Sequence, residues 1–392
     1  MEVGIIGASA AGLYSAILIK RAHPDFKVSL FERNDRVGKK LAATGNGHCN
    51  LLNRKVSYHY FHESPIAKAL FEKYPYEVLE DTLKNLGVCL TYQGDLVYPM
   101  CYHAPSYVKF LLDTATDLGI EINLSSCLLS YKKKGKRYEL GFGDKNVLVD
   151  KLVFATGGKS QKKFGSDGSL FTLFEEHGYR VAPLSPSLCP VKVKERVKPM
   201  SGLRHKAFVF AFSNGNPIYM EEGEVLFKED GLSGIAVMNA SSYLIREPRG
   251  KDLSLCLDLF PTLSANELLK MLSLGLKTNP DFFLSTVLEK PILAYIFEFC
   301  DLFGKKHLTE KDLVKLVNAM KCLRFTYAGN YDFESSQVTF GGISSESLSS
   351  NLESKKEKGV YFVGEVLNAD GLCGGFNLSF SLASSLEVAS SI

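Results

Sequence analysis

The first residues whose types and spacing suit chemistry form a glycine-rich loop near the N-terminus, from Gly7 to Gly12. Gly7 permits a tight turn, and Gly12 lets a following helix pack closely against the preceding strand. The start of such a helix presents unpaired N–H groups and the positive end of its dipole, which together bind a pyrophosphate. Ser9 stands where loops of this kind usually have their second glycine. The loop by itself is therefore compatible with FAD, with NAD or with no ligand.

The elements around this loop follow the order that a dinucleotide-binding unit requires. Residues 3–6 are expected to form a strand, residues 13–21 a helix and residues 27–32 a second strand, from their apolar periodicity. Glu32 ends the second strand, twenty residues after Gly12. A carboxylate there accepts hydrogen bonds from the adenosine ribose hydroxyls and repels a 2′-phosphate, so NADP is disfavoured in this site.

Four further segments extend this unit towards a flavin site. Residues 38–50 contain three glycines and two lysines, which suit a loop beside phosphates or a ribityl chain, although plain loops share this composition. Residues 152–158 and 359–365 are apolar strands that end in glycine turns, and the second also supplies an acidic residue. Residues 371–377 open the last helix. Its N-terminus would face the pyrimidine edge of a flavin and stabilise the negative charge of the reduced form.

These segments define the predicted site. The expected cofactor-binding residues are Gly7, Ser9, Ala10, Ala11, Gly12, Glu32, Arg33, Lys39, Lys40, Gly45, Gly47, Cys49, Asn50, Leu128, Ala155, Thr156, Gly157, Gly158, Gly364, Glu365, Gly374, Gly375, Phe376 and Asn377. A flavin carries its own redox chemistry, so catalytic residues stay unassigned. No metal ligands are predicted, because no Cys-x-x-Cys spacing occurs.

A few side chains near these segments could take part in the chemistry or could simply pack. Cys49 could be a redox-active thiol, but a small packing residue is the favoured interpretation. His48 could donate a proton, or it could hydrogen-bond to loop backbone or phosphate. Tyr98 and Tyr102 could line a pocket or belong to the core.

Bulk properties limit the classes of partner. The 392 residues are 45% apolar and 23% charged, and the formal net charge is only +3, which gives no reason to expect nucleic acid or anionic membrane. Nine cysteines at irregular spacing favour a reducing compartment and argue against a disulfide framework. The apolar run at 3–19 lacks a basic segment and contains turn glycines, so we expect a cytoplasmic protein without a signal peptide.

Taken in order, these segments resemble the HI0933-like family of flavoproteins, described as aminoacetone-oxidase-like or NAD(P)/FAD-dependent oxidoreductases. The resemblance covers nearly the whole chain. It rests on Gly38 to Asn50, Ala155 to Gly158, Gly223 to Phe227 with Gly231 to Gly234, Val338 to Ile343, and Gly364 to Asn377. Differences from the family pattern are Ser9, His48 in place of arginine, a shortened segment at 164–168, Ser379-Phe380 in place of Gln-Trp, and Ser385 in place of glycine.

The resemblance implies an α/β fold in which a Rossmann-like FAD/NAD(P)-binding domain is interrupted by an insert. We expect the FAD domain over residues 1–188 and 331–392. The insert is then 189–330, with a β-rich part at 189–262 and a helical part at 263–330. Sequences typical of capping boxes before two helices, at Ser264 and Thr309, agree with the helical part.

The expected function is an FAD-dependent oxidoreductase that transfers a hydride between flavin and a small organic substrate. No second dinucleotide fingerprint follows, so either NAD(P)H reaches the flavin transiently or the reductant is a different compound. One alternative is a flavin-binding redox sensor or interaction module without turnover. A third is a flavin-dependent RNA modifier, because some such enzymes share this FAD fold.

Overall fold

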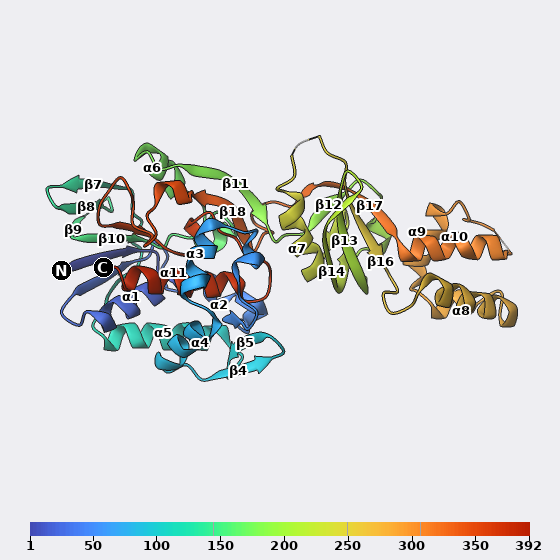
Figure 1. Cartoon of the computed structure of the whole chain (residues 1–392), viewed down its shortest axis with the longest axis horizontal. Coiled ribbons are helices and arrows are strands. Elements are labelled where there is room, and N and C mark those ends of the chain that lie inside the picture. Colours follow the sequence, from blue (N-terminus) through green and yellow to red (C-terminus); the bar gives the residue numbers. More distant parts are fainter. Residues whose placement is uncertain (144, 249, 306) are drawn as a thin grey trace. The chain divides into compact units, whose positions relative to one another are not determined.

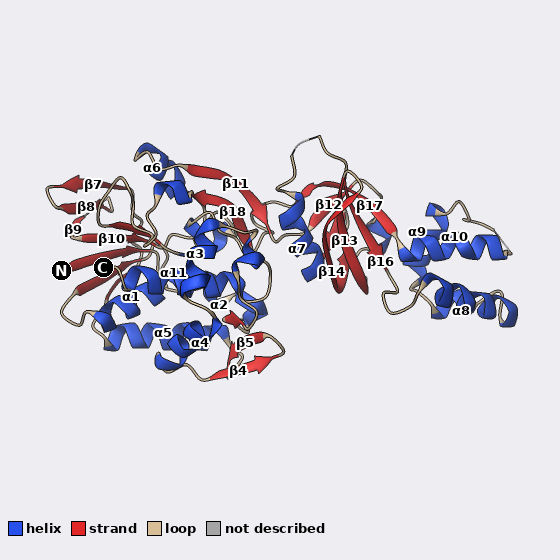
Figure 2. Ribbon diagram, in the orientation of Figure 1, coloured by secondary structure: helices blue, strands red, loops and turns tan. Residues whose placement is uncertain are grey.

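The computed structural model describes residues 1–143, 145–248, 250–305 and 307–392. The chain forms two compact units, one of Met1–Pro186 with Ser336–Ile392 and the other of Ser187–Ser335 (Figures 1 and 2). In the described part of the chain, no helix is long and apolar enough to cross a membrane.

The first unit is built on a parallel sheet with the strand order β19-β10-β1-β2-β6. Its strands are β1 (Glu2–Ile6), β2 (Lys27–Phe31), β6 (Glu121–Asn123), β10 (Lys151–Phe154) and β19 (Val360–Phe362). Strands β1, β10 and β19 are mostly apolar and buried because both faces of a parallel sheet are covered, whereas the edge strand β6 is polar and has no buried residue. Since all five strands run in one direction, the loops after them gather at one edge of the sheet.

Helices and smaller sheets cover this central sheet (Figure 2). The helices are α1 (Ala10–Ala22), α2 (Lys39–Ala42), α3 (Pro65–Lys73), α4 (Tyr76–Asn85), α5 (Ala104–Asp117), α6 (Leu170–Glu176) and α11 (Phe376–Ala389). The additional strands are β3 (Leu52–Asn53), β4 (Leu90–Gln93), β5 (Leu96–Pro99), β7 (Ser130–Lys134), β8 (Arg137–Gly141), β9 (Asn146–Val149), β11 (Val181–Ser187) and β18 (Val338–Ile343).

Helices α1 and α11 pack side by side, although they lie at opposite ends of the sequence (Figure 1). Ser385 supplies the polar link between them. Its hydroxyl is 3.0 Å from the Ser15 hydroxyl and donates to the Ala11 carbonyl at 3.0 Å. The family difference at Ser385 therefore has a structural role, because it joins the two helices that frame the predicted site.

The second unit contains a closed barrel with the strand order β12-β15-β14-β13-β16-β17. In the sequence, its helices lie between the strands of this barrel. Its elements are β12 (Val191–Val193), β13 (Arg204–Ser213), β14 (Asn216–Phe227), β15 (Gly231–Ser233), α7 (Ile235–Leu244), β16 (Leu253–Asp258), α8 (Ala265–Thr278), α9 (Lys290–Phe299), α10 (Glu310–Lys321) and β17 (Leu323–Asn330). One apolar core runs through the barrel and the helices. The predicted capping boxes at Ser264 and Thr309 are confirmed.

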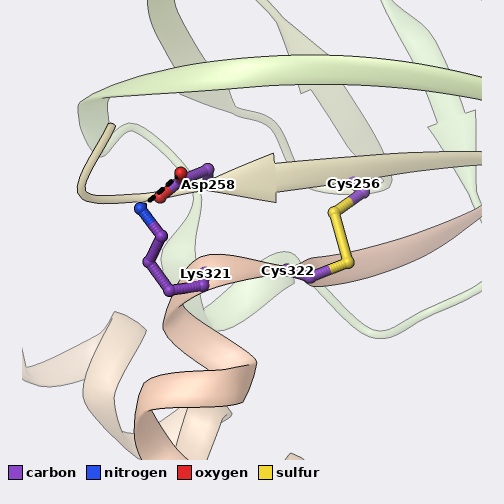
Figure 3. The surroundings of a disulfide bond; sticks show 4 residues. All are labelled: Cys256, Asp258, Lys321 and Cys322. Atoms are coloured by element: carbon purple, nitrogen blue, oxygen red, sulfur yellow. Dashed lines mark ion pairs between the residues drawn. A yellow bond between two sulfur atoms is a disulfide. The ribbon is translucent and has the colours of Figure 1, made fainter. Parts of the chain in front are cut away.

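A disulfide joins Cys256 on β16 to Cys322 at the end of α10 (Figure 3). Beside it, Lys321 forms an ion pair with Asp258 at 2.6 Å. The sequence argued against a disulfide framework, and this single bridge was not expected. The two cysteines lie 66 residues apart in sequence, and only the pairing of β16 with β17 brings them together.

This disulfide predicts a stability difference that depends on reductant. Cys322→Ser should lower the free energy of unfolding by about 4 kcal/mol, because the closed loop of this length restricts the unfolded chain. Denaturant titration with and without dithiothreitol measures the change. Cys89→Ser, at an exposed free cysteine, should change little. Equal stability of the wild type in both buffers would mean that the bridge contributes nothing.

Candidate cofactor-binding site

The predicted phosphate loop lies between the end of β1 and the start of α1. Gly7 has a positive φ of 99°. A Cβ at Gly12 would overlap the carbonyl oxygen of Gly7, so the helix approaches the loop as closely as glycine allows. The N-cap Ser9 makes no side-chain capping bond, and the first turn of α1 carries no acidic residue. The helix start therefore suits an external anion such as a pyrophosphate.

Ser9 gives a direct test of this loop. Ser9→Gly should bind FAD normally, because the hydroxyl caps nothing within the protein. Ser9→Leu should lose FAD, because a branched side chain at the start of α1 would occupy the space that the phosphates need. Flavin content per protein, read from absorbance after purification, measures both. Normal flavin content in the leucine variant would show that the pyrophosphate binds elsewhere.

Glu32 is buried directly after β2 and holds the phosphate loop in place. Its Oε2 accepts a hydrogen bond from the Ala8 N–H at 2.9 Å. Its Oε1 accepts two from Asn34, at 2.9 Å from the backbone N–H and 2.7 Å from Nδ2. An ionised carboxylate accepts about four hydrogen bonds, so capacity remains on Oε2 for a ribose hydroxyl.

Arg33 is turned towards a neighbouring loop. Its guanidinium forms an ion pair with Asp167 at 2.6 Å. Burial acts to raise the pKa of Asp167, but hydrogen bonds from Ser169 and Arg33 outweigh it and hold that pKa below its usual value. Arg33 thus fixes the segment 164–169 beside Glu32. The predicted Leu128 is buried nearby on the chain that follows β6, where Ser126 N–H donates to the Glu32 carbonyl at 2.8 Å.

The two lysines of the predicted loop have different partners. Lys39 pairs with Asp35 at 2.7 Å. Lys40 pairs with Glu365 at 2.7 Å, and the other carboxylate oxygen of Glu365 accepts from the Thr339 N–H at 3.0 Å. Lys40 and Glu365, far apart in sequence, therefore meet at the carboxyl edge of the sheet. Thr339 is a supporting residue that the sequence prediction did not include.

The glycine turns after β10 and β19 lie at the same edge. Ala155 N–H donates to the Ile6 carbonyl at 2.9 Å, which extends the pairing of β10 with β1, and Thr156 follows it. A Cβ at Gly158 would lie 2.8 Å from the Glu365 carboxylate, and one at Gly364 would lie 2.7 Å from the Ala11 Cβ. Gly158 and Gly364 therefore have no room for a side chain, because other segments of the chain pass close to them. Gly157, with φ 71°, completes the first turn.

The start of α11 is held between two asparagines. Gly375 has a φ of 88°, and a Cβ there would lie 2.7 Å from the Leu52 carbonyl oxygen. The side-chain amide of Asn50 satisfies its neighbours when its NH₂ group faces the carbonyls of Leu52 and Val97. In that orientation its oxygen accepts from the Gly375 N–H at 3.1 Å. Asn53 Nδ2 donates to the Gly374 carbonyl at 2.8 Å. Asn50 therefore acts first by positioning this helix start, and Asn53 is a second such residue that the prediction missed.

The remaining residues of this segment are also engaged within the protein. The Phe376 ring stacks on Tyr60 with centroids 4.2 Å apart. The Asn377 amide both accepts from the Gly371 N–H and donates to the Gly371 carbonyl, at 2.9 and 2.8 Å. As at α1, the first turn of α11 has no acidic residue and no side-chain cap. Helices α1 and α11 thus both begin without a side-chain cap and without an acidic residue in the first turn.

The loop at 44–50 packs against this helix start. Gly45, Asn46 and Gly47 all have left-handed backbone conformations, which glycine and asparagine adopt most readily. The His48 ring is exposed, and its Nδ1 lies 2.9 Å from the Tyr102 carbonyl oxygen. The Tyr102 ring lies 5.2 Å from the ring of Tyr98.

Cys49 is fully buried, which raises the pKa of its thiol to about 12. The thiol should therefore stay protonated at neutral pH, and reactivity should rise only as the pH approaches that value. Iodoacetamide at pH 8 should leave Cys49 unmodified while it labels the exposed Cys89 and Cys101. Peptide mass spectrometry measures the three yields. Labelling of Cys49 as fast as Cys89 would restore the redox-active interpretation.

The chain is similar to several known proteins. The chain is 28% identical to the 3-dehydro-bile acid delta(4,6)-reductase of Clostridium scindens, over 97% of this chain and 96% of that protein. It is 27% identical to the ribosomal RNA dihydrouridine synthase of Escherichia coli, over 97% and 95%. Among solved structures, E. coli quinol fumarate reductase has a TM-score of 0.49 at 16% identity, covering 100% of this chain and 70% of that one. The model of the HI0933-like protein Rossmann domain matches residues 1–391. The chain therefore belongs to the HI0933-like family.

Proposed function

We propose that this protein is an FAD-dependent oxidoreductase that reduces a carbon–carbon double bond conjugated to a carbonyl group. The observation that carries the proposal is the placement of α1 and α11. Helix α1 begins directly after β1, at the carboxyl edge of the sheet, α11 packs along α1, and neither helix has an acidic residue in its first turn. One helix start suits the pyrophosphate and the other suits the flavin ring.

The residues of the first unit have distinct roles in this proposal. Gly7 and Gly12 let the pyrophosphate approach α1, and Glu32 accepts from the adenosine ribose. Lys40 and Glu365 form the ion pair that holds the crossing loops beside the ribityl chain. When bound, FAD supplies the two-electron redox chemistry. We propose NAD(P)H as the electron donor, reaching the flavin transiently because only one dinucleotide fingerprint is present.

The names of two relatives support the proposed reaction class. A bile acid delta(4,6)-reductase and a dihydrouridine synthase both add hydrogen to a carbon–carbon double bond. In an enone and in uracil, the carbonyl withdraws electrons from that bond, so hydride adds to the carbon remote from it. A small unsaturated carbonyl compound is therefore the proposed substrate class.

The test begins with the cofactor. Heat-denatured wild-type protein should release FAD, identified by chromatography. Anaerobic protein whose flavin has been reduced photochemically should be reoxidised by 2-cyclohexen-1-one, with recovery of the flavin absorbance. Cyclohexanone, which has the carbonyl but no double bond, is the matched control and should not restore it. Protein that neither contains nor takes up a flavin would overturn the proposal.

Ribosomal RNA is the second candidate substrate, because two relatives that align with this chain over almost their whole length are named ribosomal RNA dihydrouridine synthases. The near-neutral charge of the chain argues against it, since phosphate contacts require a basic surface. Nucleoside mass spectrometry of ribosomal RNA from cells with and without this protein separates the two substrates. A dihydrouridine that disappears in the deletion strain would favour RNA, and unchanged RNA would favour the small molecule.

A further inference from the structure

We propose that the Cys256–Cys322 bridge is a reversible redox switch, which a dithiol opens and a disulfide oxidant closes, and which fixes the helices α8, α9 and α10 to the barrel. The bridge lies in the second unit, and its role does not depend on the flavin chemistry assigned to the first. The proposal rests on the place of the two cysteines in the fold, on the exposure of Cys322, and on the state of the other cysteines.

The bridge lies where the chain leaves the barrel for the helices and where it returns. The chain leaves at the end of β16 and returns at the start of β17. These two strands are paired, with Leu257 opposite Leu323 and Cys256 opposite Arg324. The two cysteines are 66 positions apart in sequence, and α8, α9 and α10 all lie between them. A closed bridge therefore ties together the two ends of the helical part.

Non-covalent contacts hold the same two ends. Lys321, the residue before Cys322, forms its ion pair with Asp258 beside the bridge (Figure 3). Its Nζ also donates to the carbonyl oxygens of Phe260 at 2.9 Å and Leu263 at 2.6 Å. Such bonds can exchange with water, whereas the disulfide opens only by reduction. Because one apolar core runs through the barrel and the helices, an open bridge should loosen this junction without unfolding the unit.

The two cysteines differ in their access to solvent. Cys322 is exposed, whereas only 3% of the Cys256 surface is exposed. An incoming thiolate therefore attacks the sulfur of Cys322, and Cys256 is the leaving group. Arg324 is the neighbour of Cys256 across the sheet, where paired side chains lie on the same face. A guanidinium at that position favours the departing thiolate, because it lowers the pKa of the thiol.

The exchange balances in electrons and protons. The first thiolate of a dithiol attacks Cys322 Sγ, which breaks the S–S bond, forms a mixed disulfide and releases the Cys256 thiolate. The second thiolate of the dithiol attacks the reductant sulfur of the mixed disulfide and releases the Cys322 thiolate. Both cysteines then bind a proton, and the reductant, which has lost two electrons and two protons, holds the new disulfide. Two exchanges with oxidised glutathione close the bridge again and yield two molecules of reduced glutathione.

The other cysteines indicate that the bridge is not part of a structural framework. The described chain keeps free thiols at Cys49, Cys89, Cys101, Cys127, Cys189 and Cys300. A small protein stabilised by disulfides pairs most of its cysteines, whereas a single accessible bridge among free thiols suits a redox-sensing site.

The chemistry is tested on the full-length protein as purified, under native conditions. The protein is equilibrated at several ratios of reduced to oxidised glutathione, and its free thiols are alkylated and located by peptide mass spectrometry. We expect Cys256 and Cys322 to gain and lose their labels together and reversibly as the ratio changes. Cysteines that stay reduced in oxidised glutathione, or a bridge that opens only in denaturant, would overturn the proposal.

The effect on the helices is tested by hydrogen–deuterium exchange of the same samples. Opening the bridge should speed amide exchange at least about tenfold in residues 259–264 and at the end of α10, because local opening there then requires less free energy. Exchange in β1, which belongs to the first unit, should not change. Equal exchange rates at the junction in oxidised and reduced protein would overturn the role of the bridge as a switch.

Two variants assign the response to the bridge. Cys322→Ser should exchange at the rate of reduced wild type in both buffers. Cys300→Ser is the matched control and should respond as the wild type does, because Cys300 is a free cysteine between the two bridge positions. A Cys300→Ser variant that no longer responds to glutathione would overturn the assignment to Cys256 and Cys322. The wild-type comparison between buffers decides the proposal even where Cys322→Ser fails to fold.

Discussion

Gly12→Ala should purify without FAD and should unfold at a lower denaturant concentration than the wild type. The added Cβ would overlap the Gly7 carbonyl oxygen, so α1 must move away from the phosphate loop. A displaced helix start no longer presents its N–H groups to the pyrophosphate. We expect a loss of about 3 kcal/mol in the free energy of unfolding, typical of overpacking in a close contact. Flavin absorbance per protein and urea titration measure the two effects.

Gly94→Ala is the matched control for this substitution. Gly94, in the turn between β4 and β5, has a positive φ, whereas Gly12 is helical, and a Cβ at Gly94 would meet no atom within 4 Å. Its cost should be about 1 kcal/mol from backbone strain alone, with full FAD content. Equal losses of flavin in both variants would show that the effect comes from general destabilisation and that α1 does not bind the pyrophosphate.

Glu32→Gln should weaken FAD binding by about 10- to 100-fold. The carboxylate accepts hydrogen bonds from Ala8 and from both nitrogens of Asn34. The glutamine side chain has only one oxygen, so either the Ala8 N–H or the two N–H groups of Asn34 would face its NH₂ group and lose their acceptor. Hydrogen bonds to a charged group are worth about 1.5–3 kcal/mol. Titration of apoprotein with FAD, followed by flavin fluorescence, measures the change.

FMN separates the two roles of Glu32. FMN has the flavin and a phosphate but no adenosine, so it cannot use a ribose contact at Glu32. The loss that Glu32→Gln causes through the phosphate loop at Ala8 should be shared by FMN, so a clearly larger loss for FAD than for FMN would show that Glu32 also binds the adenosine ribose. A parallel loss for FAD and FMN would show that Glu32 acts only through the phosphate loop that it holds at Ala8.

The fold was largely predictable because its signals are local. The strand, loop and helix at the N-terminus, and the capping boxes at Ser264 and Thr309, are written in short stretches of sequence. The Rossmann-like α/β fold and the family are confirmed. The disulfide was not predictable, since Cys256 and Cys322 meet only after two distant strands have paired.

In the candidate site too, the features that depend on local sequence were predictable and those that depend on distant contacts were not. Glycine positions follow from local turn chemistry, and the structure brings the predicted turns to one edge of the sheet. Partners of side chains depend on contacts across the chain, which no spacing reveals. Lys39 pairs with its own neighbour Asp35, whereas Lys40 reaches Glu365. Asn53 lies just beyond a segment that was singled out, and only the position of α11 gives it a role.

The most direct test of the account is an anaerobic titration of FAD-loaded protein with NADH and, separately, with NADPH, followed by addition of 2-cyclohexen-1-one. The account predicts that one of the two nicotinamides bleaches the flavin absorbance band and that the unsaturated ketone restores it. A band that neither nicotinamide bleaches and no acceptor alters would contradict it, and would favour a flavin-binding module without turnover.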